Sequence, residues 1–225
     1  MLPRVIDERK AGPSASAGDA AMTSKPLLLG SASPRRKALL ETLGIPLVVI
    51  AVDADERRRE GERPDAYLER VTFDKLERAC ADTRAASASA VLVADTVVLV
   101  DDEILGKPAG TDDAIAMLTR LSGRAHEVRT RFQLGRPKGA TGSVVTTLHA
   151  ETVSTRVHFR TLERDEIARY VATGEGLDKA GSYAVQGIGS FAVQRIEGSY
   201  ANVVGLPVCE VVVALKRAGL LAAFP

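Results

Sequence analysis

Hydrophobic residues along this chain gather in short runs that alternate with stretches of mixed character. The runs Leu27–Leu29, Leu47–Val52 and Val91–Val100 consist largely of Leu, Val and Ile and predict buried strands. The stretches 64–81 and 111–121 predict helices. Because strands and helices alternate without segregation, the pattern predicts an α/β fold.

The C-terminal half continues this alternation. Residues 124–159 predict strands joined by a Gly/Lys/Thr/Ser-rich loop near 135–143. An amphipathic helix is expected over 162–173, a strand over Ser190–Gln194 and a final helix over Val208–Ala218.

The first 25 residues differ from the rest of the chain. They are charged and then rich in Ala, Gly and Ser, and they lack the apolar core of a signal peptide. We therefore expect residues 1–25 to be a disordered extension and residues 26–225 to form a single domain. Met22 offers an alternative start of the chain.

Composition limits the classes of partner. The 225 residues include 30 Lys and Arg against 29 Asp and Glu, whereas a nucleic-acid binder normally carries a clear basic excess. No apolar run reaches the length of a membrane span. Cys80 and Cys209 lie far apart and outside any Cys/His cluster, which indicates reduced thiols in a cytoplasmic protein. We therefore expect neither nucleic acid nor a membrane as a partner.

A helix with an unusual first turn follows the first strand. Ser33 occupies the N-cap position and Pro34 the first helical position, which predicts a helix over Arg35–Leu43. Its first turn carries Arg35, Arg36 and Lys37, although the positive end of a helix favours acidic residues. Free backbone N–H groups and these cations predict a site for an anion such as a phosphate chain. The alternative is a solvated, slightly unfavourable helix start.

A carboxylate lies in the middle of the longest hydrophobic run. Asp95 is surrounded by apolar, mostly β-branched residues of a predicted strand, and burial of an unpaired carboxylate costs several kcal/mol or more. Asp95 must therefore lie at an exposed strand end, pair with a cation or bind a metal. The alternative is a strand that simply ends at Ala94.

Acidic residues also follow the strand that ends at Val52. Asp53, Asp55 and Glu56 come directly after it, at the end where α/β sheets place ligands. Hard oxygen ligands of this kind suit magnesium or manganese bound to phosphates. Such a charge cluster is more often a solvated loop.

Two further segments combine charge with glycine. Gly106-Lys107-Pro108 fixes a lysine between a flexible and a rigid residue, and residues 178–187 mix charged residues with glycines. The second segment either brings backbone close to a ligand or makes a tight connection. The chain has no G-x-S-x-G, Walker A or G-x-G-x-x-G pattern, which argues against serine hydrolase, P-loop and dinucleotide-binding sites.

In this order and spacing, the segments resemble the Maf nucleotide pyrophosphatases. The shared motifs are SASPRR, ADT, GKP, LSGR, DKAGSYAVQG and NVVGLP, and the resemblance covers about Pro26 to Arg217. It implies a mixed α/β sheet with flanking helices in two lobes around a deep cleft, similar to the inosine triphosphate pyrophosphatases. It also implies hydrolysis of nucleoside triphosphates to the monophosphate and diphosphate, a divalent cation (Mg²⁺ or Mn²⁺) and a homodimer.

The resemblance assigns roles to individual residues. It implies Asp95, Lys75 and Lys107 as catalytic residues, and Asp95, Asp55 and Glu56 as metal ligands. Asp55 stands where many members have Glu, so metal ligation by the neighbouring Glu56 is the alternative. Whether Asp95 is mainly a base or mainly a metal ligand stays open. Substrate binding is implied for Ser31, Arg35, Arg36, Thr96, Lys179 and Gln186.

Three of these positions indicate the substrate branch. The branch that hydrolyses dTTP and UTP has Arg, Thr and Gln there, as this chain does with Arg35, Thr96 and Gln186, whereas the 7-methyl-GTP branch has Trp, Gln and Glu. Neutral donors and acceptors match the edge of thymine or uracil, while an aromatic ring and a carboxylate suit a cationic methylated guanine. Two alternatives are a division-linked regulatory binding protein and a pyrophosphatase for other non-standard nucleotides.

Overall fold

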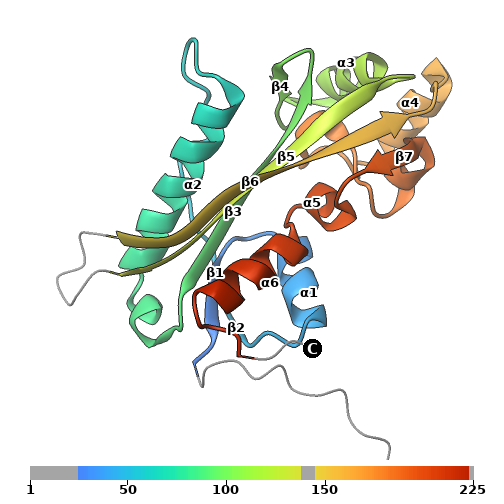
Figure 1. The fold of residues 1–225 in the computed structure, drawn as a ribbon. Coiled ribbons are helices and arrows are strands. Elements are labelled where there is room, and N and C mark those ends of the chain that lie inside the picture. Colours follow the sequence, from blue (N-terminus) through green and yellow to red (C-terminus); the bar gives the residue numbers. More distant parts are fainter. Residues whose placement is uncertain (1–24, 138–144, 223–225) are drawn as a thin grey trace, which may run out of the picture.

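The computed structural model describes residues 25–137 and 145–222 (Figure 1). The predicted N-terminal extension therefore lies outside the described residues except for Lys25, and so does most of the predicted loop near 135–143.

A seven-stranded mixed sheet forms the centre of the described part of the chain. Its strands are β1 (Leu27–Gly30), β2 (Leu47–Ile50), β3 (Val91–Val100), β4 (Glu103–Leu105), β5 (Ala125–Pro137), β6 (Val145–Phe159) and β7 (Val193–Glu197). The strand order is β2-β1-β3-β5-β6-β7, and β4 pairs with β3. Because β1 runs parallel to β2 and β3 while the other pairs are antiparallel, the predicted α/β fold with a mixed sheet is confirmed.

Helices flank both faces of this sheet. They are α1 (Pro34–Thr42), α2 (Pro64–Ala81), α3 (Thr111–Leu121), α4 (Arg164–Ala172), α5 (Tyr200–Val204) and α6 (Val208–Arg217), with 3₁₀ turns at Thr83–Ser87, Ala180–Ser182 and Ile188–Ala192. The long α2 covers one face, whereas α1 and α6 lie against the other face near β1 (Figure 1). Helices α3 and α4 pack together at the far end of the long strands.

The central strand β3 contributes side chains to the hydrophobic cores at both ends of the sheet. At its start, Val91 and Val93 pack against α2 while Leu92 packs against α1 and α6. At its end, Val97 contacts the N-terminal half of α2, and Val98 joins the core formed with α3 and α4. Successive side chains of a strand point to opposite faces, so β3 packs against other elements on both faces at each of its two ends. The two predicted lobes therefore share a continuous sheet.

Two segments differ from expectation. The predicted strand over Ser190–Gln194 is instead a 3₁₀ turn over Ile188–Ala192 followed by β7. Its first residues, Ile188 and Gly189, donate their backbone N–H groups to the side chain of Glu175 rather than to a neighbouring strand. The short helix α5 was not predicted; Ser199 caps it by accepting a hydrogen bond from the Asn202 N–H.

Both cysteines are free thiols, and Cys80 is buried whereas Cys209 is exposed. Across residues 25–137 and 145–222, none of the helices combines the length and the apolar character needed to cross a membrane.

Candidate active site

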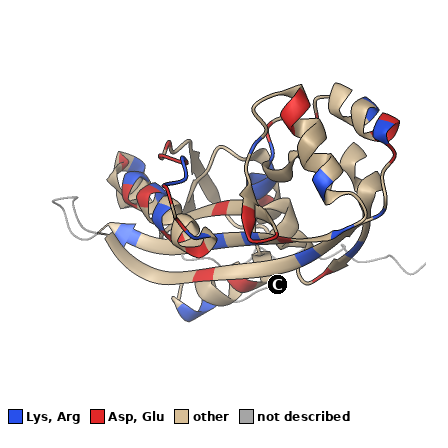
Figure 2. Cartoon of the chain, turned by 90° about the horizontal axis from the view of Figure 1, so that it is seen from above, with Lys and Arg blue, Asp and Glu red and all other residues tan. Residues whose placement is uncertain are grey.

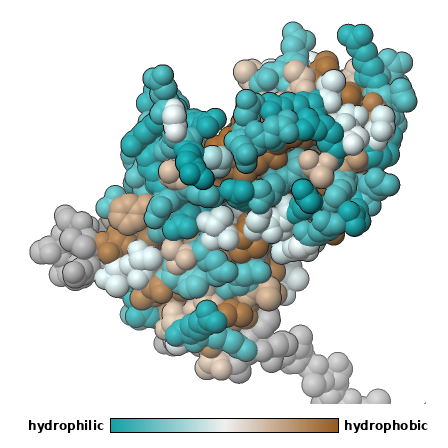
Figure 3. Space-filling view, turned by 45° about the horizontal axis from the view of Figure 1, so that its top comes forward, coloured by the Kyte–Doolittle hydropathy of each residue, from teal (hydrophilic) through white to brown (hydrophobic). Residues whose placement is uncertain are grey.

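A gap in strand pairing opens the sheet beside β3. On one edge, β1 pairs with Val91 and Leu92 and β4 pairs with Val98 to Val100, whereas β5 pairs with the other edge from Val91 to Leu99. Among the described strands, the segment between Leu92 and Val98 thus has no strand partner on the first edge. A cleft of about 690 Å³ opens there. Figure 3 shows the molecule hollowed between the protruding end of α2 and the opposite lobe, with hydrophobic residues visible between hydrophilic rims.

The cleft brings together almost all of the predicted site residues. They come from the β1–α1 turn, the loop after β2, helix α2, strand β3, the turn before α3 and the loop 178–187. The predicted residues that line it are Ser31, Arg35, Arg36, Glu56, Lys75, Asp95, Thr96, Lys107, Lys179 and Gln186.

Lys75 links two carboxylates at the bottom of the cleft. Its Nζ lies 2.7 Å from Asp95 Oδ1 and 2.7 Å from Glu56 Oε1. Asp95 is 8% exposed and Lys75 is 6% exposed, so the pair is largely removed from water. β3 continues through Asp95, so the alternative of a strand that ends at Ala94 is wrong. The buried carboxylate is paired with a cation, as burial of its charge requires.

Glu56 also connects this pair to the opposite wall. Its Oε2 lies 3.4 Å from Nζ of Lys107, which is an exposed lysine on the turn before α3. Burial opposes ionisation of Glu56, but the hydrogen bond and charge of Lys75, together with Lys107, outweigh it and lower the pKa of Glu56. Glu56 is therefore held as a carboxylate between two lysines.

Asp55 does not line the cleft. Its carboxylate binds Arg57, with 2.9 Å from Oδ1 to Nε and 3.1 Å from Oδ2 to Nη2, and its side chain is 53% exposed. The structure therefore places Glu56, the alternative metal ligand, beside Asp95 and leaves Asp55 on the outer side of the loop.

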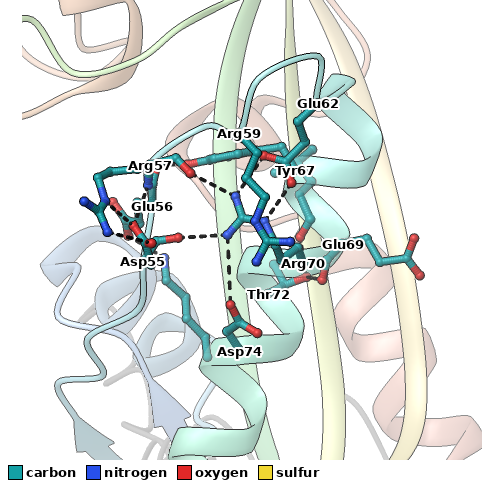
Figure 4. A network of polar contacts seen from close by, with 12 residues as sticks. Asp55, Glu56, Arg57, Arg59, Glu62, Tyr67, Glu69, Arg70, Thr72 and Asp74 are labelled. Atoms are coloured by element: carbon teal, nitrogen blue, oxygen red, sulfur yellow. Dashed lines mark hydrogen bonds and ion pairs between the residues drawn. The ribbon is translucent and has the colours of Figure 1, made fainter.

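Arg70 of α2 holds the loop that carries Glu56 (Figure 4). Its guanidinium binds the Glu62 carboxylate, with 2.7 Å from Nε to Oε1, and donates to the backbone carbonyls of Asp55 and Arg57 at 3.0 Å each. Tyr67 adds a hydrogen bond from its hydroxyl to the Glu56 carbonyl at 3.1 Å. These contacts fix the backbone on both sides of Glu56 and so orient its side chain toward Lys75.

A directed chain of hydrogen bonds orients Arg36 on the other side of β3. Arg36 donates from Nη2 to the Thr96 hydroxyl at 3.0 Å, and Thr96 contacts the Thr130 hydroxyl at 2.9 Å. Thr130 lies 3.1 Å from the Asn202 carbonyl, closer than the 3.5 Å between Thr96 and the Gly205 carbonyl, which favours Thr96 as the donor to Thr130. The Thr96 hydroxyl is thereby engaged in placing the arginine, whose Nε also donates to the Gly205 carbonyl at 2.7 Å.

The predicted start of α1 is confirmed. Ser33 is the N-cap and accepts a hydrogen bond from the Arg36 N–H, and Pro34 is the first helical residue. Ser31, at the end of β1, accepts from Arg36 Nη1 at 3.2 Å. No acidic residue occupies the first turn, so the positive end of α1 and Arg35 face the cleft without a carboxylate in that turn.

The loop 178–187 forms the far wall. Lys179 Nζ donates to the Glu175 carbonyl and to Asp178, and the Gly181 N–H donates to the Gly106 carbonyl at 3.1 Å. The last contact ties this loop to the turn that carries Lys107. Gln186 lies near the tip of the loop, exposed and at the rim of the cleft.

The electrostatics of the cleft follow from burial and mixed charge. Burial lowers the pKa of Arg36, while the negative charge of Asp95 opposes that shift. Burial, with the charges of Asp95 and Glu56 nearby, raises the pKa of Tyr67 above its usual value. Basic and acidic residues also alternate on α2 and on the loop before it (Figure 2). Inside the cleft, Asp95 and Glu56 lie among the lining cations Arg35, Arg36, Lys107 and Lys179.

Within the described residues, no group of three or more His, Cys, Asp and Glu side chains is arranged to hold a metal ion. Asp95 and Glu56 are the two carboxylates that converge, both on Lys75. Two hard oxygen donors suit Mg²⁺ or Mn²⁺ when substrate phosphates and water complete the coordination.

Sequence reasoning missed the residues that support the site. Arg70, Tyr67, Thr130 and Asn202 act through backbone carbonyls or hydroxyls that lie far away in the sequence. Asn202 stands in the NVVGLP motif, which was the one available signal; it is fully buried and donates to the Val128 carbonyl at 3.0 Å.

Comparison with known proteins identifies the family. A family model described as Maf-like protein matches residues 26–218. The dTTP/UTP pyrophosphatase of Nitratidesulfovibrio vulgaris is 46% identical over 197 residues, which cover 87% of this chain and 89% of the relative. The dTTP/UTP pyrophosphatase of Geotalea uraniireducens is 46% identical over 195 residues, covering 87% of this chain and 96% of the relative.

Among solved structures, a nucleoside-triphosphatase (dITP/XTP pyrophosphatase) from Mycobacterium abscessus is matched over 60% of this chain and 72% of its own, with 16% identity and a TM-score of 0.33. The family match spans nearly all of the described residues and includes every element around the cleft. This chain therefore belongs to the Maf-like protein family.

Proposed function

We propose that this protein hydrolyses dTTP and UTP to the nucleoside monophosphate and diphosphate. The observation that carries the proposal is the carboxylate–lysine–carboxylate centre of Asp95, Lys75 and Glu56 in a cleft with cationic walls. The similar proteins of Nitratidesulfovibrio vulgaris and Geotalea uraniireducens bear the name dTTP/UTP pyrophosphatase.

The triphosphate binds along the cations of the cleft. Arg35 and Arg36 at the start of α1 face Lys107 and Lys179 on the opposite wall, and Lys75 lies between them. Phosphate oxygens accept hydrogen bonds from such groups, and fixed positive charges stabilise the charge that develops on the leaving diphosphate. The hydrogen bonds of Arg36 to Thr96 and Gly205 keep its guanidinium in place before the substrate arrives.

Asp95 orients the attacking water. The water oxygen forms a bond to the α-phosphorus, the bond from that phosphorus to the bridging oxygen breaks, and the diphosphate leaves with the bonding electrons. Asp95 or Glu56 accepts the proton that the water releases. Lys75 holds both carboxylates in one geometry. Such positioning of the reacting groups is the main requirement of phosphoryl transfer to water.

Asp95 and Glu56, rather than the outward-facing Asp55, would hold a divalent cation together with phosphate oxygens. When bound, such an ion neutralises phosphate charge and lowers the pKa of coordinated water. The role of Mg²⁺ or Mn²⁺ is part of the proposal. The homodimer stays a prediction from the resemblance, and the cytoplasmic location stays a prediction from the cysteine usage.

The base binds at the rim formed by the loop 178–187. Gln186 offers an amide donor and acceptor there, and Val185 adds an apolar surface at the cleft. This arrangement matches the neutral edge of thymine or uracil.

A nucleotide panel tests the proposal. Diphosphate release is measured for dTTP, UTP, dCTP, ATP, dITP and 7-methyl-GTP, each with Mg²⁺, with Mn²⁺ and with a chelator. We expect dTTP and UTP to show the highest kcat/KM and the chelator to abolish turnover. Preference for dITP would identify a pyrophosphatase for other non-standard nucleotides. Binding of nucleotides without release of diphosphate would indicate a regulatory binding protein.

A further inference from the structure

The position of Gln186 depends on the backbone around it. Its side chain is exposed and makes no hydrogen bond to the residues that the structure describes. A side chain binds selectively only when its backbone is held in place. The groups that hold the backbone next to Gln186 therefore determine where its side-chain amide lies.

Two side chains that do not line the cleft hold this backbone. Glu175 accepts the Ile188 N–H at Oε1, at 2.9 Å, and the Gly189 N–H at Oε2, at 2.7 Å. Tyr170, on α4, accepts the Ala184 N–H at 3.2 Å and donates its hydroxyl proton to Glu175 Oε2 at 2.9 Å. The linked pair thus holds the chain two residues before Gln186 and two residues after it.

The carboxylate form of Glu175 suits this task. Burial opposes its ionisation, but the N–H groups of Gly189 and Ile188 and the hydroxyl of Tyr170 outweigh burial and lower the pKa of Glu175. The two oxygens of Glu175 accept three hydrogen bonds, which requires the deprotonated carboxylate. A protonated acid or an amide at this position would point a donor at the donors of Tyr170 or the loop backbone.

The turn after Gln186 fits closely against this carboxylate. Gly187 has φ of +87°, and a Cβ there would lie 2.3 Å from Glu175 Oε1. Glycine is therefore required both by the backbone conformation and by the approach of the carboxylate. The contact leaves the loop little freedom to shift while Glu175 keeps its hydrogen bonds.

We propose that Glu175 and Tyr170 form a positioning pair that places Gln186 and thereby sets the preference for thymine and uracil over other bases. The proposal rests on the proposed function, in which Gln186 contacts the base. Neither residue touches the phosphates or the Asp95 centre. The pair therefore acts on base binding and leaves the chemical step alone.

Glu175→Gln tests the pair. The amide keeps the size of the side chain but turns an NH₂ group against a backbone N–H, which releases one end of the loop. We expect KM for dTTP to rise about tenfold with kcat little changed, because base binding contributes equally to the ground state and the transition state. The ratio of kcat/KM for dTTP over dCTP should fall by a similar factor.

Tyr170→Phe should act in the same direction, and the double variant should fall short of the product of the two effects because both belong to one network. Glu166→Gln is the matched control. Glu166 belongs to α4, as Tyr170 does, and its carboxylate binds Arg160 and the Glu163 N–H rather than the backbone between Ala184 and Gly189. This variant should keep the KM and the dTTP preference of the wild type.

Gly187→Ala provides a second route if Glu175→Gln does not fold. It retains both side chains of the pair and pushes the carboxylate away from its N–H donors. A folded variant of either kind with wild-type KM and wild-type preference would overturn the positioning role, even if its melting temperature falls. A wild-type protein that does not hydrolyse dTTP would instead overturn the proposed function and, with it, the assignment of Gln186.

Discussion

Single charged residues decide the chemistry of the cleft, and Lys75 is central among them. It is almost fully buried, and its ammonium contacts Asp95 and Glu56 at equal distances. Removing one partner of a buried ion pair usually destabilises a protein by about 3–5 kcal/mol because the other charge is left uncompensated. Here Lys75 contacts two carboxylates, so its charge stays paired with Glu56 when Asp95 is neutralised. The protein should therefore tolerate the loss of the Asp95 charge.

The first prediction follows from that arrangement. Asp95→Asn should lower dTTP turnover by about 10²-fold or more, because it removes the carboxylate that we propose to orient water and hold the metal. The protein should stay folded, since Asn is nearly isosteric and Lys75 retains Glu56. Turnover at saturating Mn²⁺ and a melting curve of the same preparation check both parts. Near-normal turnover in a folded variant would remove Asp95 from the mechanism, whereas an unfolded variant would make it a structural carboxylate.

The buried residue His126 should make the stability of the fold depend on pH. It is 3% exposed, its Nε2 lies 2.7 Å from the Tyr183 hydroxyl, and burial, with the charge of His158, lowers its pKa to about 4. The unfolded chain, with a histidine pKa of about 6.5, binds more protons between these values, so stability falls as pH falls through this window. From pH 7 to pH 5 the loss should be about 2 kcal/mol.

Urea denaturation of the wild type and of His126→Gln at both pH values measures this loss. Gln preserves a polar partner for Tyr183 but does not titrate, so the variant should lose about 2 kcal/mol less than the wild type. The other histidines are common to both proteins and cancel in the comparison. Parallel pH dependence in the two proteins would show that folding does not lower the pKa of His126.

At the scale of elements, loops position the site and rigid elements hold the loops. Helix α2 contributes Lys75 directly and Arg70 indirectly, because Arg70 binds the loop that carries Glu56. Strand β3 supplies Asp95 toward α2 and Thr96 toward α1, since neighbouring side chains point to opposite faces. Both residues reach one cleft only because the strand has an unpaired edge at that point.

Arg70→Met tests the support of this loop. The substitution removes the bonds to Glu62 and to two backbone carbonyls, so Glu56 should lose its fixed position. We expect kcat/KM for dTTP to fall by about tenfold or more through misplacement of one carboxylate. Arg84→Met is the matched control because Arg84 pairs with Asp82 just beyond the other end of α2. Equal losses of activity in the two variants would contradict a specific role of Arg70.

At the scale of the whole molecule, the two lobes share strands β3, β5 and β6, which run from one core to the other. Because these strands are shared, unfolding of one lobe would also disrupt the strand pairing of the other lobe. The cleft is lined by elements of both lobes, so under the proposed function a bound nucleotide would contact both. Ligand binding and cooperative unfolding are therefore coupled in this fold.

We accordingly expect one cooperative thermal transition that a non-cleavable nucleotide shifts as a whole. At about 100 times its Kd, α,β-imido-dTTP should add about 3 kcal/mol of stability, which raises the melting temperature by several degrees. The corresponding ATP analogue at the same concentration should shift it less. Two separate transitions, or a shift confined to part of the signal, would contradict unfolding of both lobes as one unit.

Elements with local sequence signals could be predicted before the structure was known. The β-branched run of β3, the cap at Ser33 and the Pro64 start of α2 each specify structure through residues that are neighbours in the chain. The sequence also marked the site, because Arg35 in a helix first turn and Asp95 in a buried strand both violate local preference. Such conflicts are visible without any knowledge of tertiary contacts.

Which side chains meet in the cleft depends on the packing of elements that are distant in the sequence. That Lys75 meets Asp95, that Glu56 rather than Asp55 faces the cleft, and that Glu175 holds the loop around Gln186 depend on helix docking and strand register. The predicted strand over Ser190–Gln194 begins only at Val193, because the Ser190 N–H donates to the Gly187 carbonyl and the Ser190 carbonyl accepts from Val193, so both groups belong to a 3₁₀ turn. Local sequence specifies propensity and burial, but the geometry of a pair is fixed only when the elements that carry it pack together.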